Sequence, residues 1–85
     1  MSEELQSLFQ AATIRAKQLS KSPDNDTLLQ LYALYKQATA GDVSGKRPGM
    51  FDMVGRAKFD AWTKIKGLAT DDAMRGYIEL VDSLE

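Results

Sequence analysis

The chain has 85 residues, 44% hydrophobic and 27% charged, which is enough for one domain with a modest core. Its 11 basic and 12 acidic residues give a net charge of -1, whereas a general nucleic-acid binder usually carries a basic excess. Cysteine and histidine are absent, which excludes disulfides, thiolate sites and the commonest general base and metal ligand. We expect a single domain over residues 1–85 that binds no nucleic acid and no metal, so any anion site must be local.

The opening residues, MSEELQSL, are acidic and lack a signal-peptide pattern. The longest apolar run, from Leu31 to Tyr35, is far shorter than the roughly 20 residues that span a membrane. A cytoplasmic protein without stable membrane insertion is the simplest interpretation.

Apolar residues spaced three and four apart predict a first helix. Ser2 is a suitable N-cap, and Glu3 and Glu4 are favourable in the first turn. The helix ends in SKSPDND, because Pro23 cannot continue it but can begin the next one. Its apolar stripe consists of Leu5, Leu8, Phe9, Ala12, Ala16 and Leu19.

The second helix is predicted from about Asp24 to Thr39, with Gly41 closing it. Its apolar positions cover more than half of the helix circumference, which is too wide for one packing seam. They are Leu28, Leu29, Leu31, Tyr32, Leu34, Tyr35 and Ala38.

A long loop, from about Gly41 to Phe51, follows the second helix. Asp52 is a candidate cap for a third helix that runs to about Lys66 and ends at Gly67. A fourth helix is predicted to begin near Thr70, and the other connections are short. The pattern predicts an all-α four-helix bundle with a long crossover between helices 2 and 3.

Several polar residues lie where the pattern predicts apolar ones. Lys58 falls within the apolar stripe of the third helix, so it must extend to solvent, pair with an acid or meet a ligand. Tyr32 and Lys36 are one turn apart. They are either a half-buried tyrosine beside a solvated lysine, or an aromatic platform and a cation suited to a heterocycle that bears a phosphate.

Three further residues are candidates of the same kind. Lys17 lies on the flank of the first helix's stripe, and Tyr77 lies centrally in the fourth, where a buried hydroxyl needs a partner. Trp62 is interpreted as plain core.

The carboxylates show no poised pair, and the sequence has no phosphate-cradling glycine pattern and no nucleophile elbow, so we expect no catalytic residues and no enzyme.

Three blocks of the sequence carry a specific pattern: YALYKQATAGDVSGKRPGMFD, then GRAKFDAW, and finally DAMRGYIELV. The first two resemble the signature region of the acyl-CoA-binding protein family, and the third is similar to the closing helix of that family. The resemblance covers nearly the whole chain. It implies the four-helix bundle with its crossover, and a monomeric carrier and pool former of medium- to long-chain fatty acyl-CoA that needs no cofactor.

The resemblance also implies the residues of the site. Tyr32 would stack on the adenine, while Lys36 and Lys58 would hold the 3′-phosphate. The implied ligand-binding residues are Lys17, Tyr32, Tyr35, Lys36, Lys58 and Tyr77. The candidates for the acyl groove are Phe9, Thr13, Leu28 and Leu29.

The sequence departs from the family pattern at three positions. Val54 stands where many members have a lysine, Phe59 replaces the usual tryptophan, and Thr13 replaces a smaller alanine. These changes bear on affinity and on the preferred chain length.

Two rival hypotheses compete with the carrier. A helical protein-interaction module would need an exposed apolar groove but no clustered lysines and no ligand. An acyl-thioester hydrolase would require a poised base or nucleophile, and the sequence offers neither histidine nor cysteine.

Overall fold

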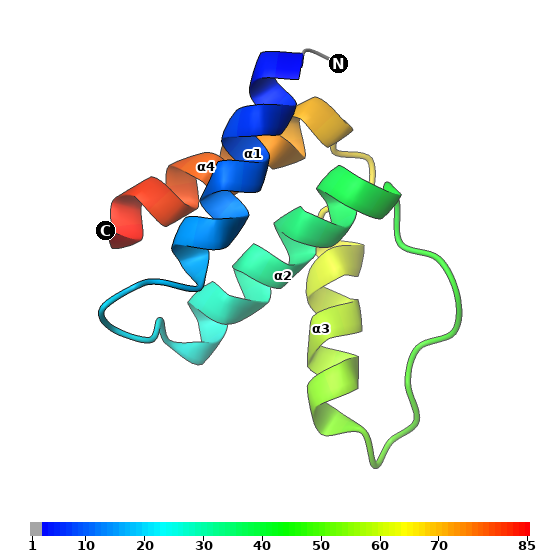
Figure 1. The fold of residues 1–85 in the computed structure, drawn as a ribbon. Coiled ribbons are helices and arrows are strands. Elements are labelled where there is room, and N and C mark those ends of the chain that lie inside the picture. Colours follow the sequence, from blue (N-terminus) through cyan, green and yellow to red (C-terminus); the bar gives the residue numbers. More distant parts are fainter. Residues whose placement is uncertain (1–2) are drawn as a thin grey trace.

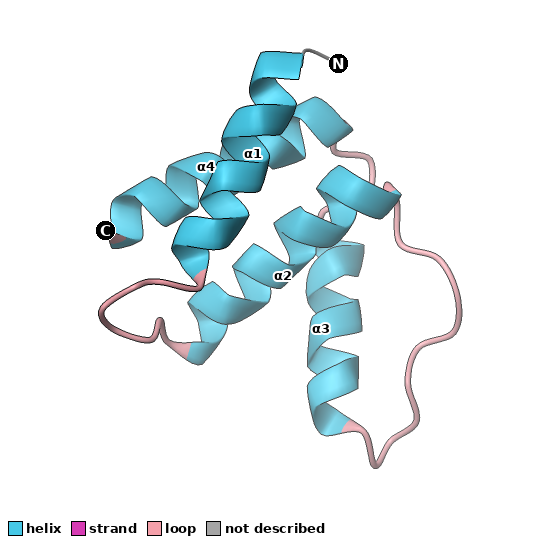
Figure 2. Cartoon of the chain, viewed as in Figure 1, coloured by secondary structure: helices cyan, strands magenta, loops and turns pink. Residues whose placement is uncertain are grey.

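A computed structural model, which describes residues 3–85, consists of four α-helices and, within those residues, contains no strand (Figures 1 and 2). The helices are α1 (Glu3–Ala16), α2 (Asn25–Ala40), α3 (Met53–Lys64) and α4 (Thr70–Leu84). The predicted all-α four-helix fold is confirmed, with the crossover at residues 41–52 joining α2 to α3. The predicted cap Ser2 lies outside the described residues.

Helix α2 lies in the middle of the molecule, with α3 on one side and α4 on the other, and α1 packs against α4 (Figure 1). This arrangement explains the wide apolar arc of α2, which has two packing faces. Leu31 and Ala38 belong to the core shared with α1 and α4, whereas Gln37 bonds to Trp62 of α3. Among the described helices, α3 packs against α2 alone.

The helix starts follow local capping chemistry. The Asp24 carboxylate accepts a hydrogen bond from the Thr27 N–H at 2.8 Å, and Asp52 accepts one from the Gly55 N–H at 3.0 Å. Each carboxylate satisfies an N–H that has no partner within its own helix. At the other end of α2, Gly41 adopts a φ of 82°, which glycine reaches without strain.

Helix α1 is shorter than the sequence predicted. It ends at Ala16, before Leu19, because the N–H groups of Lys17 and Gln18 bond three residues back, at 3.1 and 2.9 Å.

Two further helix ends differ in detail from the sequence prediction. Helix α3 ends at Lys64 instead of about Lys66, because the N–H groups of Ile65 and Lys66 bond three residues back, both at 3.2 Å. Such bonds continue the chain as tight turns after the helix. Helix α4 begins at Thr70 as predicted, but its cap is Ala69, which offers no side-chain hydrogen bond.

The main core lies between α1, α2 and α4. Its buried members are Leu5, Phe9, Ala12, Leu31, Ala38, Ala73, Met74, Tyr77 and Val81. None of the helices in the described part of the chain is long and apolar enough to span a membrane.

The crossover is fastened to α3 by two arginines. Arg47 makes a two-pronged ion pair with Asp60, at 2.9 and 2.8 Å, and Arg56 donates to the carbonyl of Pro48 at 2.9 Å. These hydrogen bonds hold the loop against α3 and fix the position of the turn that precedes this helix.

Candidate functional site

Two lysines and two aromatic residues meet along the α2–α3 seam. Tyr32 and Lys36 are one turn apart on α2, and Lys58 and Trp62 are one turn apart on α3. The Lys58 Nζ lies 5.3 Å from the centroid of the Tyr32 ring, and the Lys36 Nζ lies 5.0 Å from that of Trp62. Each cation therefore covers the ring of the opposite helix, within the roughly 6 Å range of cation–π attraction. We call these four residues the seam quartet.

The two ammonium groups of the seam quartet are not neutralised by acids. The salt bridges among residues 3–85 involve Arg15, Arg47 and Arg75, and neither quartet lysine. Lys58 is exposed, so of the three possibilities that the sequence left for it, extension to solvent is the one observed. The seam is thus a local cationic surface on a chain whose net charge is -1.

The other two tyrosines lie on the α1 side of α2. The Tyr35 ring stacks on Phe9, with centroids 5.9 Å apart, and the Tyr77 ring meets Phe9 edge-on at 5.2 Å. Tyr77 is buried, which raises the pKa of its phenol, whereas Tyr35 remains 43% exposed. Lys17 is exposed just beyond the end of α1, and within residues 3–85 it joins neither group of ring contacts.

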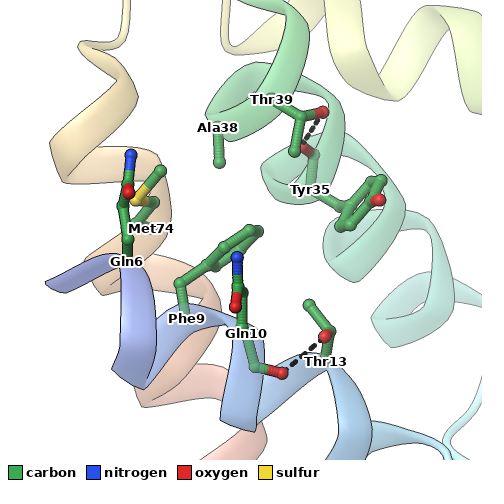
Figure 3. A pocket seen from close by; sticks show the side chains of 8 residues that line it. All are labelled: Gln6, Phe9, Gln10, Thr13, Tyr35, Ala38, Thr39 and Met74. Carbon is green, nitrogen blue, oxygen red and sulfur yellow. Dashed lines mark hydrogen bonds between the residues drawn. The ribbon is translucent and has the colours of Figure 1, made fainter. Parts of the chain in front are cut away.

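A hollow of about 410 Å³ lies between α1, α2 and α4 (Figure 3). It is lined by Gln6, Phe9, Gln10, Thr13, Tyr35, Ala38, Thr39 and Met74. Two of its hydroxyls are engaged within their own helices: Thr13 donates to the Gln10 carbonyl at 2.6 Å, and Thr39 donates to the Tyr35 carbonyl at 2.8 Å. The lining therefore combines amides and hydroxyls with the apolar side chains of Phe9, Ala38 and Met74.

A second hollow, of about 380 Å³, lies between the starts of α2 and α3. It is lined by Asn25, Leu28, Leu29, Met53, Val54, Ala57 and Lys58. Most of these side chains are apolar, and Lys58 belongs both to this hollow and to the seam quartet. The four candidates for the acyl groove therefore divide, with Leu28 and Leu29 here and Phe9 and Thr13 in the first hollow.

A buried polar network that the sequence pattern did not predict adjoins the quartet. Gln37 is 1% exposed; its amide donates to Asp42 and to the Leu68 carbonyl, both at 2.8 Å, and accepts from the Trp62 indole at 3.1 Å. Trp62 is buried, as expected. Its indole N–H donates to Gln37, and its ring makes the cation–π contact with Lys36. The wide apolar arc of α2 indicated a second packing face, but apolar periodicity does not place a polar residue such as Gln37 in it.

Asp42 joins the crossover to the turn after α3 within this network. Its carboxylate accepts from the Gly67 N–H at 2.7 Å and from the Gln37 amide. These two hydrogen bonds, the one from Gly67 first, hold the pKa of Asp42 below its ordinary value. The network therefore links α2 and the crossover to α3 and the turn after it, which helps to fix the register of the quartet.

The chain is similar to known proteins over most of its length. Residues 6–81 match the family described as acyl CoA binding protein. Acyl-CoA-binding protein homolog 1 of Caenorhabditis elegans is 53% identical over 76 residues, covering 89% of this chain and 88% of that protein. An acyl-CoA-binding protein of Brassica napus is 51% identical over 76 residues, covering 89% and 83%. The crystal structure of Oryza sativa acyl-CoA-binding protein 2 has a TM-score of 0.90 at 42% identity, covering 94% of this chain and 89% of that one.

Proposed function

The chain belongs to the acyl-CoA-binding protein family, and we propose that it binds medium- to long-chain fatty acyl-CoA thioesters and carries them as an intracellular pool. The observation that carries the proposal is the seam quartet, in which two ammonium groups form no salt bridge within residues 3–85 and one of them, that of Lys58, also lines an apolar hollow. A ligand with phosphates at one end and an aliphatic chain at the other satisfies both parts of this surface.

The quartet would recognise the nucleotide end of the ligand. Lys36 and Lys58 supply charge to the 3′-phosphate, and Tyr32 offers its ring to the adenine. Lys58 covers that ring in the structure, so binding requires its ammonium to leave the ring. The phosphate is the stronger partner, because a charge-assisted hydrogen bond exceeds an exposed cation–π contact. The further residues proposed to contact the ligand are Lys17, Tyr35 and Tyr77.

The acyl chain would occupy the hollow formed by Leu28 and Leu29. That hollow is mainly apolar and begins at Lys58, so the chain would extend directly from the phosphate site. Phe9 and Thr13 line the other hollow, whose amides and hydroxyls suit the amide-bearing arm of coenzyme A better than an aliphatic chain. This division assigns two roles to the four candidates of the acyl groove.

We further propose a monomeric, cytoplasmic carrier that performs no catalysis and needs no cofactor. The described residues contain no group of histidine, cysteine or acidic side chains that could hold a metal ion. The family relationship favours this carrier over a helical interaction module with an apolar groove and no ligand.

Calorimetric titration with palmitoyl-CoA tests the proposed function. We expect saturable one-to-one binding, whereas palmitate should bind far more weakly, because its carboxylate provides neither the adenine nor the 3′-phosphate. Comparable affinity for palmitate would mean that the nucleotide is not the anchor, and absence of palmitoyl-CoA binding would leave the interaction module as the better hypothesis.

The Lys58→Met substitution is expected to weaken palmitoyl-CoA binding by about 1.5–3 kcal/mol, because a charge-assisted hydrogen bond is lost. The free energy of unfolding should change by no more than about 0.5 kcal/mol, since Lys58 is exposed and the methionine keeps most of its apolar stem. Titration and chemical denaturation measure the two quantities.

Lys64→Met is the matched control. Lys64 is exposed on the same helix but lines a different hollow, together with Asp60. Equal losses of affinity in the two variants would mean that Lys58 acts through general electrostatic attraction and makes no specific contact with the ligand.

A further inference from the structure

The turn before α3 and the first residues of that helix form an exposed apolar surface. Met50 is 70% exposed, Phe51 97%, Met53 78% and Val54 67%. Four large apolar side chains exposed within five residues are unusual for a small protein and mark a surface of interaction. We call these four residues the apolar tip.

The fold does not need these side chains. The main core lies between α1, α2 and α4 and includes no member of the apolar tip. The turn is shaped by polar groups instead: the Asp52 N–H donates to the Gly49 carbonyl at 2.9 Å, and the Asp52 carboxylate caps α3. The exposed side chains of the apolar tip are therefore not explained by packing of the main core.

We propose that the apolar tip docks reversibly on a phospholipid surface that carries anionic headgroups. The turn before α3 projects beyond all four helices in the view of Figure 1, at the end of the molecule away from both termini. A narrow projection suits insertion of about 5–10 Å into the boundary between headgroups and acyl chains. A stable protein partner would need a broader face, of about 800 Å² on each side.

The charges of the segment that carries the apolar tip complement such a surface. Residues 46–58 contain four basic side chains and one acidic side chain, Asp52, in a chain whose net charge is -1. The basic residues are Lys46, Arg47, Arg56 and Lys58. Even if Asp60, the partner of Arg47, is counted as well, this segment keeps a positive excess that anionic headgroups attract.

The apolar tip is also continuous with the proposed acyl hollow. Met53 and Val54 belong to both, and Leu28, which is 44% exposed, extends the apolar surface onto α2. A docked molecule would thus place the mouth of that hollow against the lipid, so that an acyl chain could pass between them with little exposure to water. This role in loading rests on the proposed function, whereas docking rests on the exposed tip alone.

Vesicle flotation tests the docking. The chain should float with vesicles of phosphatidylcholine and phosphatidylserine, and less with phosphatidylcholine alone. Phe51→Ser should lower the ratio of bound to free protein about tenfold on the anionic vesicles, through loss of an inserted ring. Ile14→Ser is the matched control, because Ile14 is 58% exposed on α1, far along the chain from the tip, and should leave the ratio unchanged.

A spectroscopic readout identifies the residue that enters the lipid. The emission of a Phe51→Trp variant should shift to the blue when anionic vesicles are added, whereas that of Ile14→Trp should not. Absence of vesicle binding, or equal flotation of Phe51→Ser and the natural chain, overturns the proposal. Self-association that Phe51→Ser abolishes, measured by sedimentation, also overturns it, because the tip would then serve a second copy of the chain.

Palmitoyl-CoA titration of the same variants separates docking from ligand binding. Phe51→Ser should bind palmitoyl-CoA with unchanged affinity. If the natural chain floats but does not bind palmitoyl-CoA, the proposed function fails and docking is supported on its own.

Discussion

Removal of the 3′-phosphate from palmitoyl-CoA is expected to weaken its binding by about 2–5 kcal/mol, the range for breaking a partly desolvated charge pair. The dephospho ester keeps the acyl chain, the thioester and the adenine. It lacks the group that we propose Lys36 and Lys58 share, and in the structure each of these ammonium groups lies over an aromatic ring and forms no salt bridge within residues 3–85. Parallel calorimetric titrations of the two esters measure the loss.

A double-mutant cycle with Lys36→Ala shows whether this lysine meets that phosphate. The loss from Lys36→Ala should largely disappear with the dephospho ester, because the partner is already absent. Lys64→Ala, on the far side of the seam, should show no such coupling. Strictly additive losses for Lys36 would mean that it contacts another part of the ligand.

Gln37→Leu is expected to lower the free energy of unfolding by about 2–4 kcal/mol, although leucine has a similar size and Gln37 lies on a helix. The amide of Gln37 makes three hydrogen bonds at a position that is 1% exposed. Leucine would leave the Leu68 carbonyl and the Asp42 carboxylate each without one donor inside the protein. Chemical denaturation followed by circular dichroism measures the change.

The matched control for this substitution is Gln30→Leu. Gln30 is exposed on the same helix, so its replacement should change the free energy of unfolding by no more than about 0.5 kcal/mol. If Gln37→Leu were as mild as Gln30→Leu, the buried network would contribute little, and packing alone would hold α3 in register.

The helices and their starts could be predicted because they depend on neighbouring residues. Apolar spacing gave the number and order of the helices, and Asp24 and Asp52 act as caps through bonds to residues three positions later. The wide apolar arc of α2 indicated more than one partner. It could not say which helix would take which face, because that depends on contacts between distant segments.

The site was predictable in composition but not in arrangement. The spacing of Tyr32 and Lys36 showed that they are neighbours. The contacts of the Lys58 ammonium with the Tyr32 ring and of the Lys36 ammonium with the Trp62 ring, however, depend on the register of α3 against α2. That register is set in part by Gln37, a polar residue that no periodicity rule places in a core. The division of the acyl-groove candidates between two hollows has the same origin, since it follows from the packing of all four helices.

Helix α3 packs against one other helix of the described fold, and it carries half of the seam quartet. Apart from the crossover, which Arg47 and Arg56 fasten to it, α3 is held by α2 alone, so we expect this seam to open locally at a lower free energy than the main core. A ligand that bridges the seam binds the closed arrangement only, and by mass action a hundredfold excess over its Kd adds about 2.7 kcal/mol to that arrangement. If the ligand bridges the seam as proposed, loading the carrier and holding α3 against α2 are one equilibrium, in which the cargo acts as a further neighbour of α3.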